Sequence, residues 1–265
     1  MRTLAAGCVL LLAICCLRTY GDSRDRDDSL PRQFADIAKS LRPVTDKVTT
    51  HRYQEMYGRF LMPIVKYRHR RNESLKLFEI GLGCGDHKVL GTGASAQLWL
   101  SVLSPHDILW FAEFDKECVD SLRAKGKISD RLNIVTGDQE DIPTLEQWVS
   151  RTGGEFDIII DDGGHNNNQI FNTFNVLFHK ALKPGGLYFV EDLQASRFPA
   201  RFRGIKPTTG PLVMVDVIKD WIEQLLTIPA VNITYIIPKG IKYITCQYEA
   251  CVIAKCTEND VARCS

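Results

Sequence analysis

The sequence has almost no net charge, because 33 lysine and arginine residues nearly balance 32 aspartate and glutamate residues, which gives +1 at pH 7. Proteins that bind nucleic acid or acidic membranes through electrostatic attraction carry a clear positive excess. The near balance therefore predicts that nucleic acid is not a partner.

The sequence also lacks an apolar run long enough for a membrane span. Residues 4–17 carry no charge, but this run is shorter than the roughly 20 residues that a spanning helix needs. Because Arg2 precedes the run and Gly21 follows it closely, the pattern predicts a secretory signal peptide over residues 1–21. We expect a protein that is secreted or lies in the lumen of the secretory pathway, with an uncleaved anchor as the alternative and no stable membrane span.

Paired cysteine and histidine residues at the spacing of a structural zinc site are absent. Beyond the predicted leader, the cysteines are Cys84, Cys118, Cys246, Cys251, Cys256 and Cys264. An even number in an exported chain permits disulfides, and we expect at least one bridge among the four C-terminal cysteines. Cys84 and Cys118 fall in the predicted core, where we expect free buried thiols.

Charge is dense just after the leader, so residues 22–44 are predicted to form a charged N-terminal extension. A catalytic domain over residues 45–256 and a tail over residues 257–265 complete the expected organisation. Asn72 and Asn232 begin glycosylation tripeptides, and Asn72 is the better candidate because Asn232 opens a predicted strand.

Short apolar runs alternate with helical patterns from residue 75 onward. The predicted strands cover residues 75–80, 108–114, 132–135, 156–160 and 186–190, with a closing strand pair at 231–237 and 243–254. This alternation predicts an α/β fold with a doubly wound, mostly parallel, seven-stranded, Rossmann-like sheet and a C-terminal antiparallel strand. In such sheets the ligand lies beyond the carboxyl ends of the strands.

The first predicted strand ends in a glycine-rich turn that contains Gly81, Gly83 and Gly85 after Glu79. A dinucleotide site would need another glycine at position 86 to approach the pyrophosphate, but that residue is Asp86. The spacing instead resembles the cofactor turn of class I S-adenosylmethionine-dependent methyltransferases. S-adenosylmethionine carries an ammonium and a sulfonium, which suit an acidic site.

The next two strand ends also carry polar side chains. Glu113 can accept hydrogen bonds from both hydroxyls of a ribose, whereas Asp115 is expected to cap the following helix. In this fold family the turn after the third strand passes the adenine, so Asp138 or Gln139 is predicted to bind its amino group. An equally supported alternative is that these two residues only form an ordinary turn and bind no ligand.

Two further strand ends carry paired carboxylates. Asp161 and Asp162 end the fourth strand three residues before His165, and Glu191 and Asp192 end the fifth. If these strands are neighbours, the like charges raise one another's pKa, and a hard cation such as Mg²⁺ would relieve the repulsion. The alternative is two independent pairs at exposed strand ends.

These motifs resemble the metal-dependent sugar O-methyltransferases of macrolide antibiotic pathways, of the mycinamicin and tylosin type. The motifs that carry the resemblance are residues 159–165, 183–186 and 190–194. Residues 45–47 and 53–57 also look like this family. The similarity as a whole covers residues 45–200. Serine is usual in this family where Gly164 stands, so the turn that carries His165 is expected to be looser here. Aromatic residues expected after Gln194 are replaced, so a macrolide substrate is not inferred.

The resemblance implies that Asp162, Glu191 and Asp192 bind the metal and that His165 is the general base. It also implies that Asp161 supports the site or touches the cofactor. We therefore expect an S-adenosylmethionine-dependent O-methyltransferase, assisted by Mg²⁺ or another divalent cation, that acts on a hydroxyl of a sugar-like or diol-containing small molecule. The other histidines, which are His51, His69, His87, His106 and His179, receive no role.

Two alternatives remain at this stage. A non-catalytic secreted protein could retain the cofactor-binding fold, since S-adenosylmethionine is made in the cytosol and a lumenal enzyme would need an imported supply. A nicotinamide-dependent oxidoreductase is disfavoured by Asp86. The sequence leaves both a monomer and a homo-oligomer open.

Overall fold

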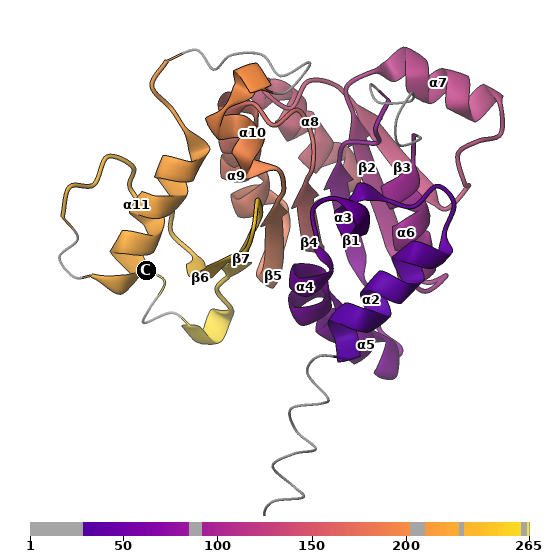
Figure 1. Cartoon of the computed structure of the whole chain (residues 1–265), viewed down its shortest axis with the longest axis horizontal. Coiled ribbons are helices and arrows are strands. Elements are labelled where there is room, and N and C mark those ends of the chain that lie inside the picture. Colours follow the sequence, from indigo (N-terminus) through magenta and orange to yellow (C-terminus); the bar gives the residue numbers. More distant parts are fainter. Residues whose placement is uncertain (1–28, 85–91, 202–209, 228–230, 261–263, 265) are drawn as a thin grey trace, which may run out of the picture.

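A seven-stranded sheet forms the centre of the protein in a computed structural model that describes residues 29–84, 92–201, 210–227, 231–260 and 264 (Figure 1). Its strand order is β3-β2-β1-β4-β5-β7-β6. The strands are β1 (Lys76–Ile80), β2 (Ile108–Glu113), β3 (Leu132–Thr136), β4 (Phe156–Asp161), β5 (Leu182–Val190), β6 (Ile241–Cys246) and β7 (Cys251–Lys255). All neighbouring pairs among β1–β5 are parallel, and β7 is antiparallel to both β5 and β6. The predicted doubly wound sheet is confirmed.

The strand register brings the carboxyl ends of the central strands to one edge. Ile80 pairs with Ala112 of β2 and with Asp161 of β4, and Asp161 pairs with Val190 of β5. The residues that follow β1, β4 and β5 therefore emerge side by side, as expected for parallel strands with the ligand edge at their carboxyl ends.

Helices cover both faces of the sheet, as Figure 1 shows. The helical elements are α2 (Ser29–Ser40), α3 (Asp46–Thr49), α4 (Gln54–Met56), the π-helix η1 (Tyr57–Leu61), α5 (Met62–Arg70), α6 (Ala94–Val102), α7 (Lys116–Ala124), α8 (Ile142–Thr152), α9 (Asn167–Lys180), α10 (Leu193–Arg197), η2 (Pro199–Arg201), α11 (Met214–Leu226) and η3 (Glu258–Asp260). Ile158 and Ile160 of β4 join the apolar cluster that includes α2, η1 and α6, while Ile159 joins the cluster under α8, α9 and α11. Successive side chains of a strand point to opposite faces, so the isoleucine run of β4 serves both cores.

Helix α2 lies in the segment that the sequence assigns to a charged extension. Its Phe34 is completely buried, and its ring lies 5.3 Å from the ring of Tyr57 and 5.9 Å from that of Trp99. The second half of that segment therefore packs into the core of the domain, because the apolar face of α2 contacts aromatic side chains there.

The structure corrects two expectations about the cysteines and the C-terminal strands. Cys84 and Cys118 are bonded to each other, and the other bridges are Cys246–Cys251 and Cys256–Cys264. The prediction of free thiols was wrong because the turn after β1 meets the start of α7 only in the folded chain. Residues 231–237 do not form a strand; β6 and β7 form a hairpin whose loop, residues 247–250, interrupts the predicted strand 243–254.

Among the described residues, no helix is both long and apolar enough to cross a membrane.

Candidate active site

The acidic side chains that follow β4 and β5 meet around one buried lysine. Lys47 Nζ lies 2.6 Å from Asp162 Oδ2, 2.7 Å from Glu191 Oε2 and 3.2 Å from Glu79 Oε1. Burial lowers the pKa of Lys47, but these three carboxylates outweigh it and raise the pKa well above its ordinary value. The lysine is therefore a permanent cation within the site.

Sequence reasoning assigned no role to Lys47 beyond its place in the resemblance. It lies in the short helix α3, which Thr45 caps by accepting a hydrogen bond from the Lys47 amide. The only signal in the sequence was the similarity of residues 45–47 to the macrolide sugar O-methyltransferases, because nothing local predicts that this helix lies beside β4 and β5.

Next to this lysine lie three side chains of the kinds that bind metal ions, which are Asp162, His165 and Asp192. Their ligand atoms all lie within 4.8 Å of one another, and His165 Nε2 is 3.6 Å from Asp192 Oδ2 and 4.0 Å from Asp162 Oδ1. The side chains are 23%, 19% and 19% exposed for Asp162, His165 and Asp192, so they are partly open to solvent. The two carboxylates can hold a divalent cation such as Mg²⁺, and the His165 imidazole lies beside them.

Glu191 does not belong to this group in the structure, although the sequence predicted it as a ligand. Its carboxylate is buried, binds Lys47 through Oε2, and accepts a hydrogen bond from the Tyr57 hydroxyl through Oε1. Burial raises the pKa of Glu191 well above its ordinary value, with Lys47 opposing that effect. The geometry thus assembles His165 with Asp162 and Asp192, while Glu191 holds Lys47.

His165 and Asp192 both adopt left-handed backbone conformations, with φ of 54° and 52°. Residues other than glycine seldom adopt this conformation, and such strain concentrates at functional sites. The Tyr53 hydroxyl donates to Asp192 Oδ1 at 2.6 Å and fixes the orientation of that carboxylate.

His51 also takes part in the site, although sequence reasoning assigned it no role. Its Nδ1 lies 2.7 Å from Glu249 Oε2 and 3.4 Å from Asp192 Oδ1. Its ring stacks on Tyr53 with the centroids 5.1 Å apart. Burial lowers the pKa of His51, but Asp192 and Glu249 outweigh it and raise the pKa above its ordinary value.

The glycine turn after β1 packs directly against the loop that carries Asp162. Gly81 has a φ of 101°, and a Cβ at this position would lie 2.1 Å from the carbonyl oxygen of Asp162. Gly83 also has a positive φ, of 80°, whereas Gly85 and Asp86 lie outside the described residues. Only glycine allows this close approach, so the predicted cofactor turn and the acidic loop share one edge.

Glu113 supports this turn, whereas Glu79 precedes it on β1 and has other partners. Glu113 Oε2 accepts the amides of Leu82 and Cys84 at 3.1 and 3.3 Å, so it holds the turn in place. Glu79 is fully buried, accepts the Trp99 indole N–H through Oε2, and pairs with the Lys47 ammonium through Oε1 at 3.2 Å. Burial raises the pKa of Glu79 to about 7, with Lys47 opposing. Both carboxylate oxygens of Glu79 therefore have partners within the protein.

Gln139 and Asp161 support the loop of His165. Gln139 Nε2 donates to Asp161 Oδ1 at 3.0 Å, and its Oε1 accepts the Gly164 amide at 2.8 Å. Burial raises the pKa of Asp161 to about 6, while the bond from Gln139 opposes it. The side-chain amide of Gln139 is thus engaged by the protein at both ends. Asp138 accepts the amide of Glu140 at 2.8 Å, as an ordinary turn residue does.

Gly164 does not loosen the loop, contrary to our expectation. A Cβ at this position would lie 2.1 Å from Gln169 Oε1, so the glycine permits close packing against α9. Together with the hydrogen bond to Gln139, this packing fixes the turn immediately before His165.

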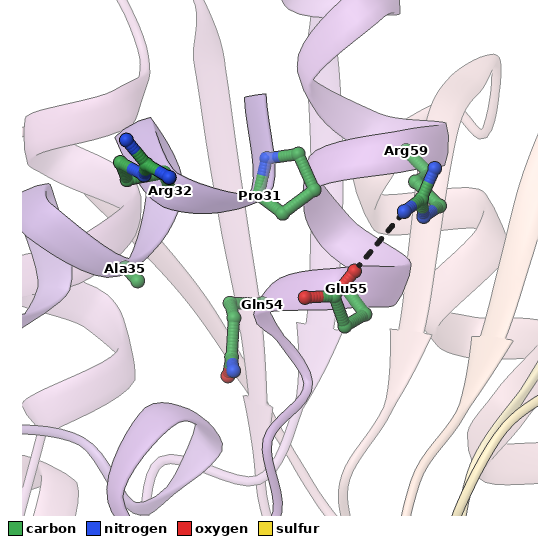
Figure 2. A pocket seen from close by; sticks show the side chains of 6 residues that line it. All are labelled: Pro31, Arg32, Ala35, Gln54, Glu55 and Arg59. Atoms are coloured by element: carbon green, nitrogen blue, oxygen red, sulfur yellow. Dashed lines mark ion pairs between the residues drawn. The ribbon is translucent and has the colours of Figure 1, made fainter. Parts of the chain in front are cut away.

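A separate pocket lies between α2 and α4 (Figure 2). Its lining residues are Pro31, Arg32, Ala35, Gln54, Glu55 and Arg59. Arg59 and Glu55 form an ion pair of 3.4 Å within it. None of the site residues predicted from the sequence lines this pocket.

The fold is that of class I methyltransferases. The MycE methyltransferase from the mycinamycin biosynthetic pathway, solved in complex with Mg, SAH and mycinamycin VI, superposes with a TM-score of 0.62 at 24% identity, over 84% of this chain and 54% of that chain. No protein family model matches the chain.

The chain is similar in sequence to sugar O-methyltransferases of antibiotic pathways. It is 35% identical over 133 residues to the mycinamicin VI 2''-O-methyltransferase of Micromonospora griseorubida, which is 50% of this chain and 31% of that protein. It is 31% identical over 159 residues to the demethylmacrocin O-methyltransferase of Streptomyces fradiae, which is 60% of this chain and 38% of that protein. The resemblance predicted from the motifs is confirmed, and the chain spans less than two fifths of the length of these two relatives.

Proposed function

We propose that the protein is an S-adenosylmethionine-dependent O-methyltransferase, assisted by a divalent cation, that acts on a hydroxyl of a sugar-like or diol-containing small molecule. The observation that carries this proposal is the contact between Gly81 and the carbonyl of Asp162. Through that contact, the predicted cofactor turn adjoins a loop whose Asp162 and His165 converge with Asp192.

The residues of the chain divide the chemistry between them. Asp162 and Asp192 would hold the cation, which lowers the pKa of a bound hydroxyl when it is present. His165 would accept the proton from that hydroxyl, because a neutral imidazole is a general base near pH 7. The rest of the rate enhancement would come from holding the acceptor oxygen in line with the methyl group of the cofactor that the glycine turn binds.

The test of this function combines cofactor binding with turnover. We expect S-adenosylmethionine to bind in calorimetry, and a panel of sugar and phenol diols to yield a methylated product whose formation stops with a chelator and returns with Mg²⁺. His165→Ala should lower turnover by about 100-fold or more while cofactor affinity stays within about twofold (0.4 kcal/mol). Exposed His106 offers the matched control, His106→Ala.

Two outcomes would contradict the proposal. Turnover that is insensitive to the chelator would remove the cation from the reaction. Cofactor binding without methyl transfer to any member of the panel would favour the alternative of a non-catalytic protein that retains the fold.

We also propose that the chain enters the secretory pathway through residues 1–21. The three disulfides among the described residues suit an oxidising compartment, and Asn72 is exposed, as a glycan acceptor must be. Expression in a eukaryotic cell should give a chain with a new N-terminus near residue 22 and a glycosidase-sensitive mass that Asn72→Gln removes. A chain that keeps Met1 and appears in the cytosol would contradict this.

A further inference from the structure

The carboxylate of Asp192 faces two different imidazoles. Its Oδ2 lies 3.6 Å from His165 Nε2, within the group described above. Its Oδ1 lies 3.4 Å from His51 Nδ1. A carboxylate that presents one oxygen to each of two groups can bridge two cations, as carboxylates do in sites that hold a metal pair.

The second group consists of His51, Asp192 and Glu249. Their ligand atoms lie within 4.8 Å of one another, as in the first group. His51 and Glu249 are 16% and 13% exposed, so the group is sheltered but open to ions. One imidazole nitrogen and two carboxylate oxygens suit Mn²⁺ or Zn²⁺ better than Mg²⁺, which prefers oxygen ligands alone.

Charge balance at this edge of the sheet favours a further cation. Six carboxylates connect through ion pairs to Lys47, His51 or His165, namely Asp46, Glu79, Asp162, Glu191, Asp192 and Glu249. Within the described ranges, Lys47 is the only lysine or arginine that pairs with any of them. Lys47 supplies a single permanent positive charge to this cluster, and like charges that are partly buried together repel strongly, so a further cation is favoured.

The ligands of the second group are held by independent parts of the fold. Glu249 lies in the hairpin loop that the Cys246–Cys251 disulfide closes, and its carbonyl accepts the Leu193 amide at 2.8 Å. His51 stacks on Tyr53, whose hydroxyl binds Asp192. Supports of this kind fix ligand side chains before a metal binds.

We propose that His51, Asp192 and Glu249 form a second divalent-cation site, of the Mn²⁺ or Zn²⁺ class, which shares Asp192 with the first. The first cation is the one that the proposed function invokes, but the second site requires no acceptor and no methyl transfer. Two cations bridged by one carboxylate would bind two oxygens of the same small molecule.

The experiment measures Mn²⁺ bound to the full chain after equilibrium dialysis, together with its electron paramagnetic resonance spectrum. We expect two ions per chain in the wild type, with the spectrum of a spin-coupled pair. Glu249→Gln is close to isosteric and should bind one ion, with the spectrum of isolated Mn²⁺. His51→Asn should give the same result, and the exposed control Glu258→Gln should keep two ions.

One ion per chain in the wild type overturns the second site, and so does a Glu249→Gln variant that keeps the coupled pair. If both variants fail to fold by circular dichroism, the wild-type stoichiometry decides alone. Methyl transfer measured on the same samples separates the two proposals. Activity with one bound ion would reject only the second site, whereas a chain that binds no ion would reject both cation sites.

Discussion

Lys47 Nζ lies 2.6 Å from Asp162 Oδ2, so a buried ammonium from the N-terminal segment touches the loop that carries His165. The same ammonium reaches Glu191 and Glu79. It therefore neutralises charge at the ends of three strands and fixes the acidic side chains before any other cation binds.

Replacement of this lysine should destabilise the fold. Lys47→Met would leave three carboxylates without their common partner, and removing one member of a buried ion pair costs about 3–5 kcal/mol. Urea denaturation at pH 7 should show a loss of that order. Lys116→Met, which removes an exposed ion pair with Asp120, should change stability by less than about 1 kcal/mol. An unchanged midpoint for Lys47→Met would show that the lysine is not the main counter-charge.

The close approach of Gly81 to Asp162 predicts a selective loss of cofactor binding. Gly81→Ala places a Cβ 2.1 Å from a backbone oxygen, so the turn must move. Calorimetry should show S-adenosylmethionine affinity falling at least about tenfold (1.4 kcal/mol). Gly126→Ala is the matched control, because Gly126 also has a positive φ but has no atom within 4 Å of the added Cβ. Equal affinities in the two variants would separate this turn from the cofactor.

Gln139 offers a test between two roles. Because its amide binds Asp161 and the amide before His165, we expect Gln139→Ala to lower kcat by about tenfold or more, since small misplacements of catalytic groups are costly. The dissociation constant for S-adenosylmethionine should stay within about twofold (0.4 kcal/mol). Exposed Gln97 provides the control, Gln97→Ala. A weakened cofactor affinity with unchanged kcat would instead support adenine recognition by Gln139.

The acid dependence of stability should depend partly on Asp107, which directly precedes β2. Burial raises the pKa of Asp107, but bonds from the amides of Leu75 and Ser104 and from His69 outweigh it and hold the pKa below its ordinary value of 3.8. A carboxyl whose pKa is lowered by folding stabilises the protein above its unfolded pKa, and this contribution disappears as pH falls through its folded pKa.

Asp107→Asn should therefore cost about 1–3 kcal/mol at pH 7, and the difference from wild type should shrink as the pH falls below about 4. Urea denaturation across this pH range measures it. Asp130→Asn, at an exposed position, should follow the wild type throughout. A difference that stays constant with pH would mean that the loss comes from packing and not from the ionised carboxylate.

The sequence predicted the sheet and the edge at which the site forms. Alternating apolar runs fix the strands, and the carboxyl ends of parallel strands share one edge, so Asp162 and Asp192 could be brought together by topology alone. The same reasoning could not foresee that Glu191 binds Lys47 and Tyr57. Which neighbour a carboxylate binds depends on side-chain packing across the sheet.

Residues of the N-terminal segment were the main omission. Lys47, His51 and Tyr53 precede the first strand, and no periodicity in residues 45–57 indicates that they lie against β4 and β5. The bond between Cys84 and Cys118 was missed for the same reason, since a burial pattern indicates where a cysteine lies but not which cysteine faces it.

The sequence by itself determined the class of fold and the strand ends that carry carboxylates, because hydrophobic periodicity and glycine positions act over a few residues at a time. Only the tertiary structure decided that Lys47 is the buried counter-charge, that Glu191 binds it, and that His51 meets Glu249. These pairings join residues up to 198 positions apart, and long-range packing alone sets the distances on which their electrostatic energies depend.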